Sequence, residues 1–166
     1  MMPDTRTHIY ALALGSNRPL SAQRSPARLL DEAVVRIGAV ATIMRVSPTI
    51  ETAPIGPSRR RFANGALLVE SVLAPRAMLT ALQAIEHDLG RKRFRRWGAR
   101  SVDIDIILWS GGGFSSRTLT IPHVEFRRRA FVLTPLRAIA PGWRDPRTGL
   151  AIRHLAFRLG KAASKG

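Results

Sequence analysis

The segment Ser101–Trp109 constrains the fold of this chain more than any other part of the sequence. It is an apolar, β-branched run of the kind that forms buried strands, yet it contains two aspartates. Successive side chains on a strand alternate between its two faces, so Asp103 and Asp105 project from the same face. Ile104 and Ile106 project from the other. Two adjacent like charges need compensation, and either a divalent cation or arginine supplies it.

Length and composition indicate one α+β domain. The chain has 166 residues, of which 45% are hydrophobic, and no apolar run is long enough to span a bilayer. Met1 to Thr7 is polar and contains no apolar signal-peptide core. Cysteine is absent, which excludes disulfides, thiolate metal sites and cysteine nucleophiles. We therefore expect a cytoplasmic protein with a single domain over 1–166, an ordered core over 8–159 and a tail over 160–166.

The chain is strongly basic, with 27 Lys and Arg against 11 Asp and Glu and a net charge of +16. This balance suggests a nucleic-acid partner. However, the only lysines are Lys92, Lys161 and Lys165, and such an arginine bias is also typical of genome composition. The runs Arg59–Arg61 and Arg127–Arg129 are most simply solvated surface. Composition leaves both interpretations open.

The order of predicted elements is that of a split βαβ, ferredoxin-like βαββαβ sheet of the α+β class, with helices on both faces and a C-terminal helical extension. Ser25 and Gly38 are the start and stop signals of the first helix, and Pro135 is expected to kink or restart a later one. Strands are expected at His8–Leu14, Ala39–Thr52 (broken near Pro48), Phe62–Val72 and Ser101–Trp109, and helices at Pro26–Ile37, Leu73–Leu89, Arg128–Ile139 and Leu150–Leu159.

No glycine-rich phosphate-binding loop is present, neither G-x-x-x-x-G-K-[ST] nor G-x-G-x-x-G. If a nucleotide binds, metal ions and side-chain cations must therefore hold its phosphates. Asp103 and Asp105 offer hard oxygen ligands to a metal, and Arg91, Arg93 and Arg100 can bind phosphate in a bidentate manner. A solvated strand face is the simpler explanation of the Asp pair alone, but the apolar neighbours weaken it.

Four further residues are weighed between a structural and a functional role. Phe62 and Phe131 are most simply core residues. His123 follows a proline, and a lone histidine is more often structural than functional, although it can donate to a phosphate. Asn64 lies inside an apolar strand, where a buried amide needs partners, and its donor and acceptor suit a flat heterocycle.

Motifs spread over roughly Tyr10 to Trp143 occur in a distinctive order. They are Ala13-Leu14-Gly15-Ser16-Asn17, Ser47-Pro48, Glu51–Gly56, Phe62-Ala63-Asn64, Leu82–Glu86, Gly90–Arg93, Arg96–Ile106, Ile121-Pro122-His123 and Arg129–Leu133. Together they resemble one family, the 6-hydroxymethyl-7,8-dihydropterin pyrophosphokinases of folate biosynthesis. The most specific block is Arg-Trp-Gly followed by Arg and Asp-x-Asp-Ile.

The resemblance implies transfer of the β,γ-diphosphate of ATP to the hydroxymethyl group of the pterin, which leaves AMP. It implies that Asp103 and Asp105 hold two Mg²⁺ ions that bridge the ATP phosphates. It also implies that Arg91 and Arg100 stabilise the charge of the diphosphate during transfer.

The resemblance further assigns binding residues, and it implies three closing loops, Gly15–Ser25, Ala53–Arg61 and Arg91–Arg100. The implied ATP-binding residues are Gln83, Glu86, Arg93, Trp97, Arg100, Ile106, Thr120, His123 and Arg129. The implied pterin-binding residues are Phe62 and Phe131, which sandwich the ring, Asn64, which contacts its edge together with backbone groups of Thr52 and Ile55, and Ala53. The sequence departs from the usual family pattern at Ala99, Thr118 and Val124.

A nucleic-acid-binding sheet is the competing hypothesis. RNA-binding sheets of this shape display aromatic residues on their central strands. Here those strands carry Asp103, Asp105, Asn64 and aliphatic residues, so we expect no nucleic-acid partner and no membrane partner. A relative that acts on another pterin, or one without activity, remains an alternative. We expect a monomer or a weak dimer.

Overall fold

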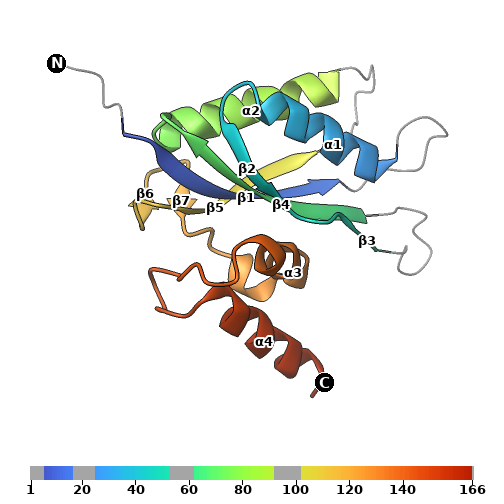
Figure 1. Cartoon of the computed structure of the whole chain (residues 1–166), viewed down its shortest axis with the longest axis vertical. Coiled ribbons are helices and arrows are strands. Elements are labelled where there is room, and N and C mark those ends of the chain that lie inside the picture. Colours follow the sequence, from blue (N-terminus) through green and yellow to red (C-terminus); the bar gives the residue numbers. More distant parts are fainter. Residues whose placement is uncertain (1–5, 17–24, 53–61, 92–101, 166) are drawn as a thin grey trace.

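The computed structural model of the chain describes residues 6–16, 25–52, 62–91 and 102–165, with the backbone only at Thr52 and Arg91 (Figure 1). It is a mixed α+β structure. The strands are β1 (His8–Ser16), β2 (Thr42–Val46), β3 (Ile50–Thr52), β4 (Phe62–Ser71), β5 (Asp103–Trp109), β6 (Phe114–Ser115) and β7 (Thr120–Ile121). The helices are α1 (Pro26–Ile37), α2 (Pro75–Arg91), the 3₁₀ helix η1 (Phe126–Arg128), α3 (Ala130–Ile139) and α4 (Ile152–Ala163).

The main sheet has the strand order β2-β4-β1-β5, and all of its paired strands are antiparallel. β3 pairs with the beginning of β4, while β6 and β7 form a separate small sheet. β1 is central, and its register places Gly15 opposite Asn64 on β4 and opposite Asp103 on β5. Three chain segments that are distant in sequence therefore meet in one row.

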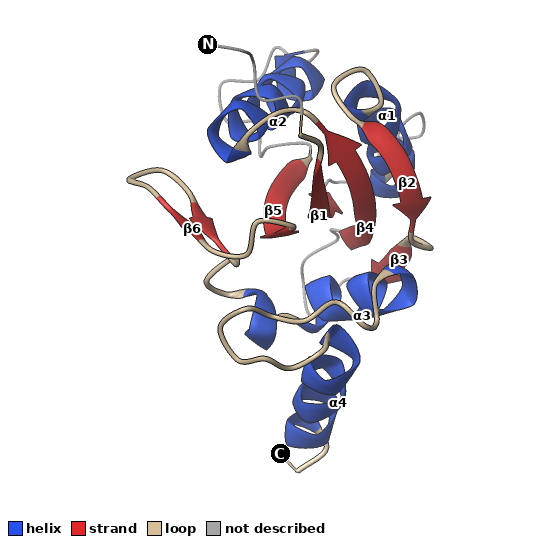
Figure 2. Ribbon diagram, turned by 60° about the vertical axis from the view of Figure 1, so that its left-hand side comes forward, coloured by secondary structure: helices blue, strands red, loops and turns tan. Residues whose placement is uncertain are grey.

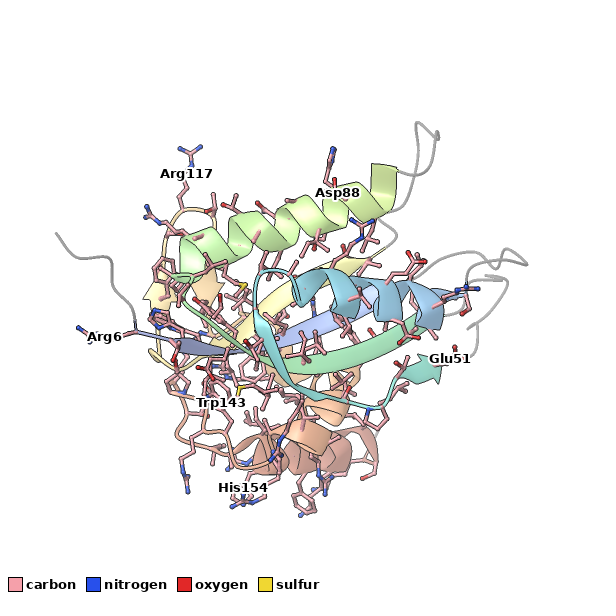
Figure 3. The ribbon with its side chains drawn as sticks, turned by 45° about the horizontal axis from the view of Figure 1, so that its top comes forward. Arg6, Glu51, Asp88, Arg117, Trp143 and His154 are labelled. Atoms are coloured by element: carbon pink, nitrogen blue, oxygen red, sulfur yellow. The ribbon has the colours of Figure 1, made fainter. Side chains whose placement is uncertain are left out.

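Each face of the main sheet has its own apolar cluster and its own helices (Figure 2). Tyr10, Leu12 and Leu14 belong to the cluster that includes α1 and α2. Ala11 and Ala13, from the same strand, belong to the cluster that includes α3 and α4. This alternation follows from the period of two along a strand. Figure 3 shows the two helical layers on opposite sides, with Asp88 of α2 and His154 of α4 labelled.

The predicted elements are present, with shifts at several ends. The expected strand 39–52 is divided into β2 and β3, with the predicted break near Pro48. α2 begins at Pro75 instead of Leu73, because the amide of Leu73 bonds the hydroxyl of Ser71 in the preceding turn. α3 begins at Ala130 because 126–128 form a 3₁₀ turn.

The helix does not restart at Pro135. Pro135 lies inside the continuous helix α3 with a buried ring. Burial of Leu133 and Leu136 beside it offsets the lost backbone hydrogen bond. The expected tail is also partly helical, because α4 continues to Ala163 and the amide of Ser164 donates to the carbonyl of Gly160. None of the helices in the described ranges is long and apolar enough to cross a membrane.

A buried ion pair joins η1 to the turn before α4. Arg127 donates to both carboxylate oxygens of Asp145, at 2.6 Å and 2.7 Å, and Asp145 is fully buried. The Thr148 hydroxyl and the Arg147 amide also donate to this carboxylate. Burial by itself would raise the pKa of Asp145, but these hydrogen bonds and the charge of Arg127 hold the pKa below its ordinary value of 3.8.

Candidate active site

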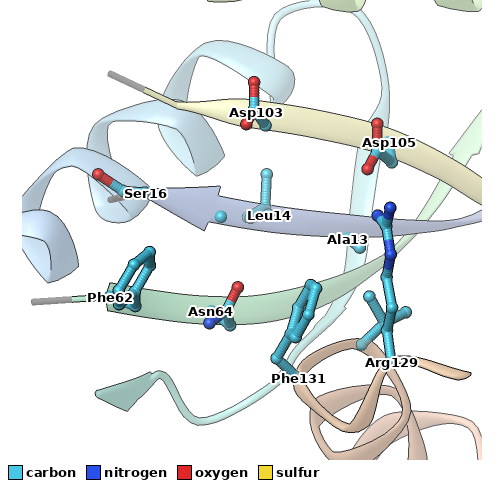
Figure 4. Close-up of a pocket in the computed structure, with 11 residues that line it drawn as sticks. Ala13, Leu14, Ser16, Phe62, Asn64, Asp103, Asp105, Arg129 and Phe131 are labelled. Carbon is cyan, nitrogen blue, oxygen red and sulfur yellow. The ribbon is translucent and has the colours of Figure 1, made fainter. Parts of the chain in front are cut away.

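A pocket of about 300 Å³ opens on the α3 side of the sheet, where β1, β4 and β5 lie beside the beginning of α3 (Figure 4). It combines two carboxylates, one guanidinium, one amide and two aromatic rings. Its lining residues are Ala13, Leu14, Gly15, Ser16, Phe62, Asn64, Asp103, Asp105, Arg129, Phe131 and Val132.

Strand alternation brings the polar pocket residues to one face. Asp103 lies opposite Gly15 and Asp105 opposite Ala13 on the neighbouring strand β1. Both aspartates line the pocket, whereas Ile104 and Ile106 are each only 3% exposed on the opposite face. The prediction that the two carboxylates share one face is therefore confirmed.

Phe62 and Phe131 are not core residues, so the simpler expectation for both was wrong. They are 37% and 48% exposed, although both are large apolar side chains. The two rings stand on either side of Asn64 at the pocket (Figure 4). Apolar rings that face a cavity in this way suit a flat aromatic ligand, which restores the burial that the folded chain does not provide.

We expect Phe131→Ala to weaken binding of a flat pterin about tenfold, because stacking on one aromatic face contributes roughly 1–3 kcal/mol. Fluorescence titration with 6-hydroxymethylpterin measures this. The matched control is Phe157→Ala, which removes a 66% exposed ring from α4, away from the pocket. Equal affinities for the wild type and both variants would contradict the assignment of Phe131.

His123 lies beside Asp105 and is oriented by the backbone. Its own amide donates to the carbonyl of Ile107 at 3.0 Å, and its Nδ1 accepts from the amide of Glu125 at 3.1 Å. In neutral His123 the proton is therefore on Nε2, which lies 3.9 Å from Oδ2 of Asp105.

The surroundings of His123 favour its neutral form. Burial lowers the pKa of His123, and so does the positive charge of Arg129. The negative charges of Asp105 and Glu125 raise the pKa, but the net result is a pKa below the ordinary value of 6.5. At neutral pH the ring therefore offers one Nε2–H donor beside Asp105, without a full positive charge.

Arg129 supplies a cation within the pocket. It is the residue directly before α3, and its Cζ lies 5.7 Å from the centre of the Phe131 ring. Its side chain extends toward the Asp105 side of the pocket (Figure 4). Arg129 thus joins the carboxylate side of the site to the aromatic side.

The remaining described ATP-site candidates lie on the edge of β5 that faces away from β1, or on the neighbouring elements α2 and β7. The amide of Ile104 donates to Oε1 of Glu86 at 2.7 Å, so the peptide groups of Ile104 and Ile106 point to this edge. The buried side chain of Ile106 cannot contact a ligand, and only its backbone remains available. Gln83 is exposed on α2, one turn before Glu86, and Thr120 is exposed on β7.

The other predicted site residues are outside the described part of the chain. They are Ala53, Ile55, Arg93, Trp97 and Arg100, together with the side chain of Arg91. The backbone of Thr52, which is the expected contact of this residue, lies at the end of β3 opposite Phe62. Of the three departures from the family pattern, Ala99 also lies outside, whereas Thr118 and Val124 are exposed at the surface.

The Asp pair fits a magnesium ion that binds together with a phosphate. Within 6–16, 25–52, 62–91 and 102–165, no group of three or more histidine or acidic side chains is arranged to hold a metal alone. Magnesium commonly takes only one or two carboxylates from the protein and completes its shell with water and substrate phosphates. The donor set of Asp103 and Asp105 matches this second type of site.

Sequence reasoning missed several pocket-lining residues. Gly15 was part of a matching motif, and a glycine at the end of an apolar strand is a signal of close approach. Leu14, Ser16 and Val132 also lie in matching motifs, but nothing in the sequence assigned them a role, because their place in the pocket depends on how the strands and α3 pack.

The fold and the pocket together define a class: an α+β domain whose sheet carries two paired carboxylates beside two exposed aromatic rings. The chain belongs to the family described as 7,8-dihydro-6-hydroxymethylpterin-pyrophosphokinase (HPPK), whose profile matches residues 11–141.

Curated relatives support this membership. The chain is 40% identical over 136 residues to a 2-amino-4-hydroxy-6-hydroxymethyldihydropteridine pyrophosphokinase of Pseudomonas aeruginosa, covering 81% of this chain and 82% of that one. It is 38% identical over 128 residues to a protein of the same name from Synechocystis sp., covering 76% of this chain and 66% of that one.

Solved structures show a similar fold. A crystal structure of Plasmodium falciparum HPPK-DHPS superposes on 99% of this chain with a TM-score of 0.74 and 15% identity. The match covers 45% of that longer chain, so this chain spans less than half of its length. At this identity the likeness concerns the fold alone.

Proposed function

We propose that this protein transfers the β,γ-diphosphate of ATP to the hydroxymethyl group of 6-hydroxymethyl-7,8-dihydropterin and releases AMP. The observation that carries the proposal is the single pocket in which Asp103 and Asp105 lie on the same face as Phe62, Asn64 and Phe131. Membership of the HPPK family and the names of the relatives support the reaction and its place in folate synthesis. The strand order β2-β4-β1-β5 supports classing the sheet as ferredoxin-like.

The pterin ring stacks between Phe62 and Phe131, and the amide of Asn64 hydrogen-bonds to its edge. An amide offers one acceptor and two donors, which matches the alternating donors and acceptors along the edge of a pterin. The hydroxymethyl group then points across β1 toward the Asp103 side of the pocket, because Asn64 and Asp103 flank the same residue of β1.

ATP occupies the side of the site that borders β5. Its phosphates lie near Asp103 and Asp105, where the His123 Nε2–H and the Arg129 guanidinium donate to phosphate oxygens. Its base lies along the edge of β5 that faces away from β1, to which the peptide groups of Ile106 point. Glu86, which already binds the Ile104 amide, fixes this edge.

Asp103 and Asp105 hold the magnesium ions that accompany ATP. When bound there, magnesium neutralises the phosphate charge and helps to align the β-phosphorus with the attacking oxygen. The protein residues orient both substrates so that the hydroxyl oxygen of the pterin lies in line with the bond to be broken. The roles of Arg91 and Arg100 in stabilising the transferring charge rest on the family motif.

The test is an assay of products. The purified protein, incubated with MgATP and 6-hydroxymethyl-7,8-dihydropterin, should form AMP and the pterin diphosphate in equal amounts, with no AMP when the pterin is omitted. Formation of ADP as the nucleotide product, or the absence of any pterin-dependent product, would refute the proposal. Omission of magnesium should stop the reaction, which tests the metal assignment separately.

A further inference from the structure

Gly15 occupies the middle of a row of residues that crosses the pocket. It is paired with Asn64 on one side and with Asp103 on the other, and all three line the pocket. Figure 4 shows Asn64 and Asp103 on the two strands that flank this part of β1. No side chain therefore stands between the amide and the carboxylate.

The backbone at this position does not require glycine. Among the described residues, the glycines with a positive φ angle are Gly112 and Gly149, and Gly15 is not one of them. A glycine within a strand lowers stability relative to a larger residue, because it gains no packing and loses more chain entropy. The benefit of glycine here is therefore the space that its missing side chain leaves in the pocket.

The space at Gly15 is limited by Asn64. An added Cβ at Gly15 would lie 3.2 Å from Oδ1 of Asn64, which is closer than Cβ atoms normally approach an oxygen. The amide would have to rotate or shift to accept a methyl group at Gly15. The orientation of Asn64 thus depends on the absence of a side chain on the neighbouring strand.

The row also has a defined length. Neighbouring strands lie about 4.8 Å apart, so the backbones of β4 at Asn64 and β5 at Asp103 are about 10 Å apart across β1. This is close to the length of a fused two-ring system that carries one exocyclic carbon atom. A single ring bound to the Asn64 amide would fall short of the Asp103 side of the pocket.

We propose that Gly15 determines acceptor specificity. Because Gly15 has no side chain, the Asn64 amide keeps its binding orientation, and the pocket surface above β1 stays open to the edge of a two-ring acceptor. The inference rests on the proposed function for the identity of that acceptor. Gly15 itself contributes no chemical group to the reaction.

The test compares two glycines on opposite faces of the sheet. Gly15→Ala should weaken binding of 6-hydroxymethylpterin about tenfold, equivalent to about 1.4 kcal/mol, and change the affinity for magnesium and a non-hydrolysable ATP analogue less than about twofold. The matched control is Gly65→Ala on β4, where an added Cβ meets its nearest atoms at 3.6 Å and 3.9 Å, an ordinary contact distance. Unchanged pterin affinity in a folded Gly15→Ala protein would overturn the inference.

A double-mutant cycle examines the coupling of Gly15 to Asn64. In an Asn64→Ala background, Gly15→Ala should have a clearly smaller effect on pterin affinity, because the amide that the methyl group displaces is gone. Fully additive effects of the two substitutions would contradict the proposed coupling.

A ligand-free measurement separates this inference from the proposed function. The side-chain NH₂ signals of Asn64 in a ¹⁵N NMR spectrum should move in Gly15→Ala and stay in place in Gly65→Ala. Unmoved Asn64 signals in Gly15→Ala would overturn the inference whatever the substrate is. Failure of the wild type to bind any pterin, with the Asn64 signals displaced as expected, would refute the proposed acceptor and leave the role of Gly15 intact.

Discussion

Replacement of Asp103 or Asp105 by asparagine is expected to lower kcat about a thousandfold, equivalent to about 4 kcal/mol of transition-state stabilisation. Asparagine preserves the size of each side chain and removes the charge that holds magnesium. Steady-state kinetics with MgATP and the hydroxymethyl-dihydropterin measure the loss. Thermal unfolding of each variant checks that the protein remains folded, so that the loss of kcat is assigned to the missing charge.

The control for this experiment is Asp88→Asn. Asp88 is an exposed residue of α2 whose carboxylate lies 3.9 Å from Arg36, and an exposed pair of this kind contributes little. The variant should retain activity close to that of the wild type. Full activity in Asp103→Asn or Asp105→Asn would show that the strand does not hold the metal, whereas equal loss in Asp88→Asn would indicate a nonspecific effect of charge.

Asp145→Asn is expected to lower the free energy of unfolding at pH 7 by about 3 kcal/mol. Removing one partner of a buried ion pair leaves the other charge uncompensated, and such changes cost roughly 3–5 kcal/mol. In this protein the uncompensated group is Arg127, whose two bonds to Asp145 join η1 to the turn before α4. Denaturant unfolding of the wild type and the variant measures the difference.

The pH dependence of this difference has a defined sign. The pKa of Asp145 is lowered in the folded protein, so its stabilising effect is fully present above the ordinary value of 3.8. The effect is lost as the pH falls through the lower folded-state pKa. The stability gap between the wild type and Asp145→Asn should therefore stay constant from pH 7 to about pH 5 and narrow below pH 3.8. The surface variant Asp31→Asn on α1 should show no comparable difference in the free energy of unfolding. A difference between the wild type and Asp145→Asn that widens as the pH falls would contradict the assignment.

Local sequence signals predicted the parts of the fold that depend on neighbouring residues. The first helix begins and ends where the Ser25 cap and Gly38 indicated, and the Ser25 hydroxyl accepts from the Arg28 amide as such a cap does. The shared face of Asp103 and Asp105 follows from strand periodicity alone. These features need no knowledge of the tertiary structure.

The features that the sequence could not predict depend on contacts between distant segments. Residue type alone favoured core positions for Phe62 and Phe131, and only the family resemblance placed them at a ligand site, because the packing of α3 determines that this part of the sheet is left uncovered. The pair of Arg127 with Asp145 joins residues 18 positions apart. The burial of the Ile106 side chain could be predicted from its alternation with Asp105. The family motif gave Ile106 as an ATP-binding residue without indicating that only its backbone can make the contact.

The most direct test of the central claim, diphosphate transfer at this pocket, follows isotopic labels from ATP into the products. With [β-³²P]ATP and 6-hydroxymethyl-7,8-dihydropterin, the label should appear in the pterin product, and with [α-³²P]ATP it should remain in AMP. Formation of the labelled pterin product and of labelled AMP should both be strongly reduced in Asp105→Asn. Recovery of the β label in ADP would contradict the account, because it would show transfer of a single phosphoryl group.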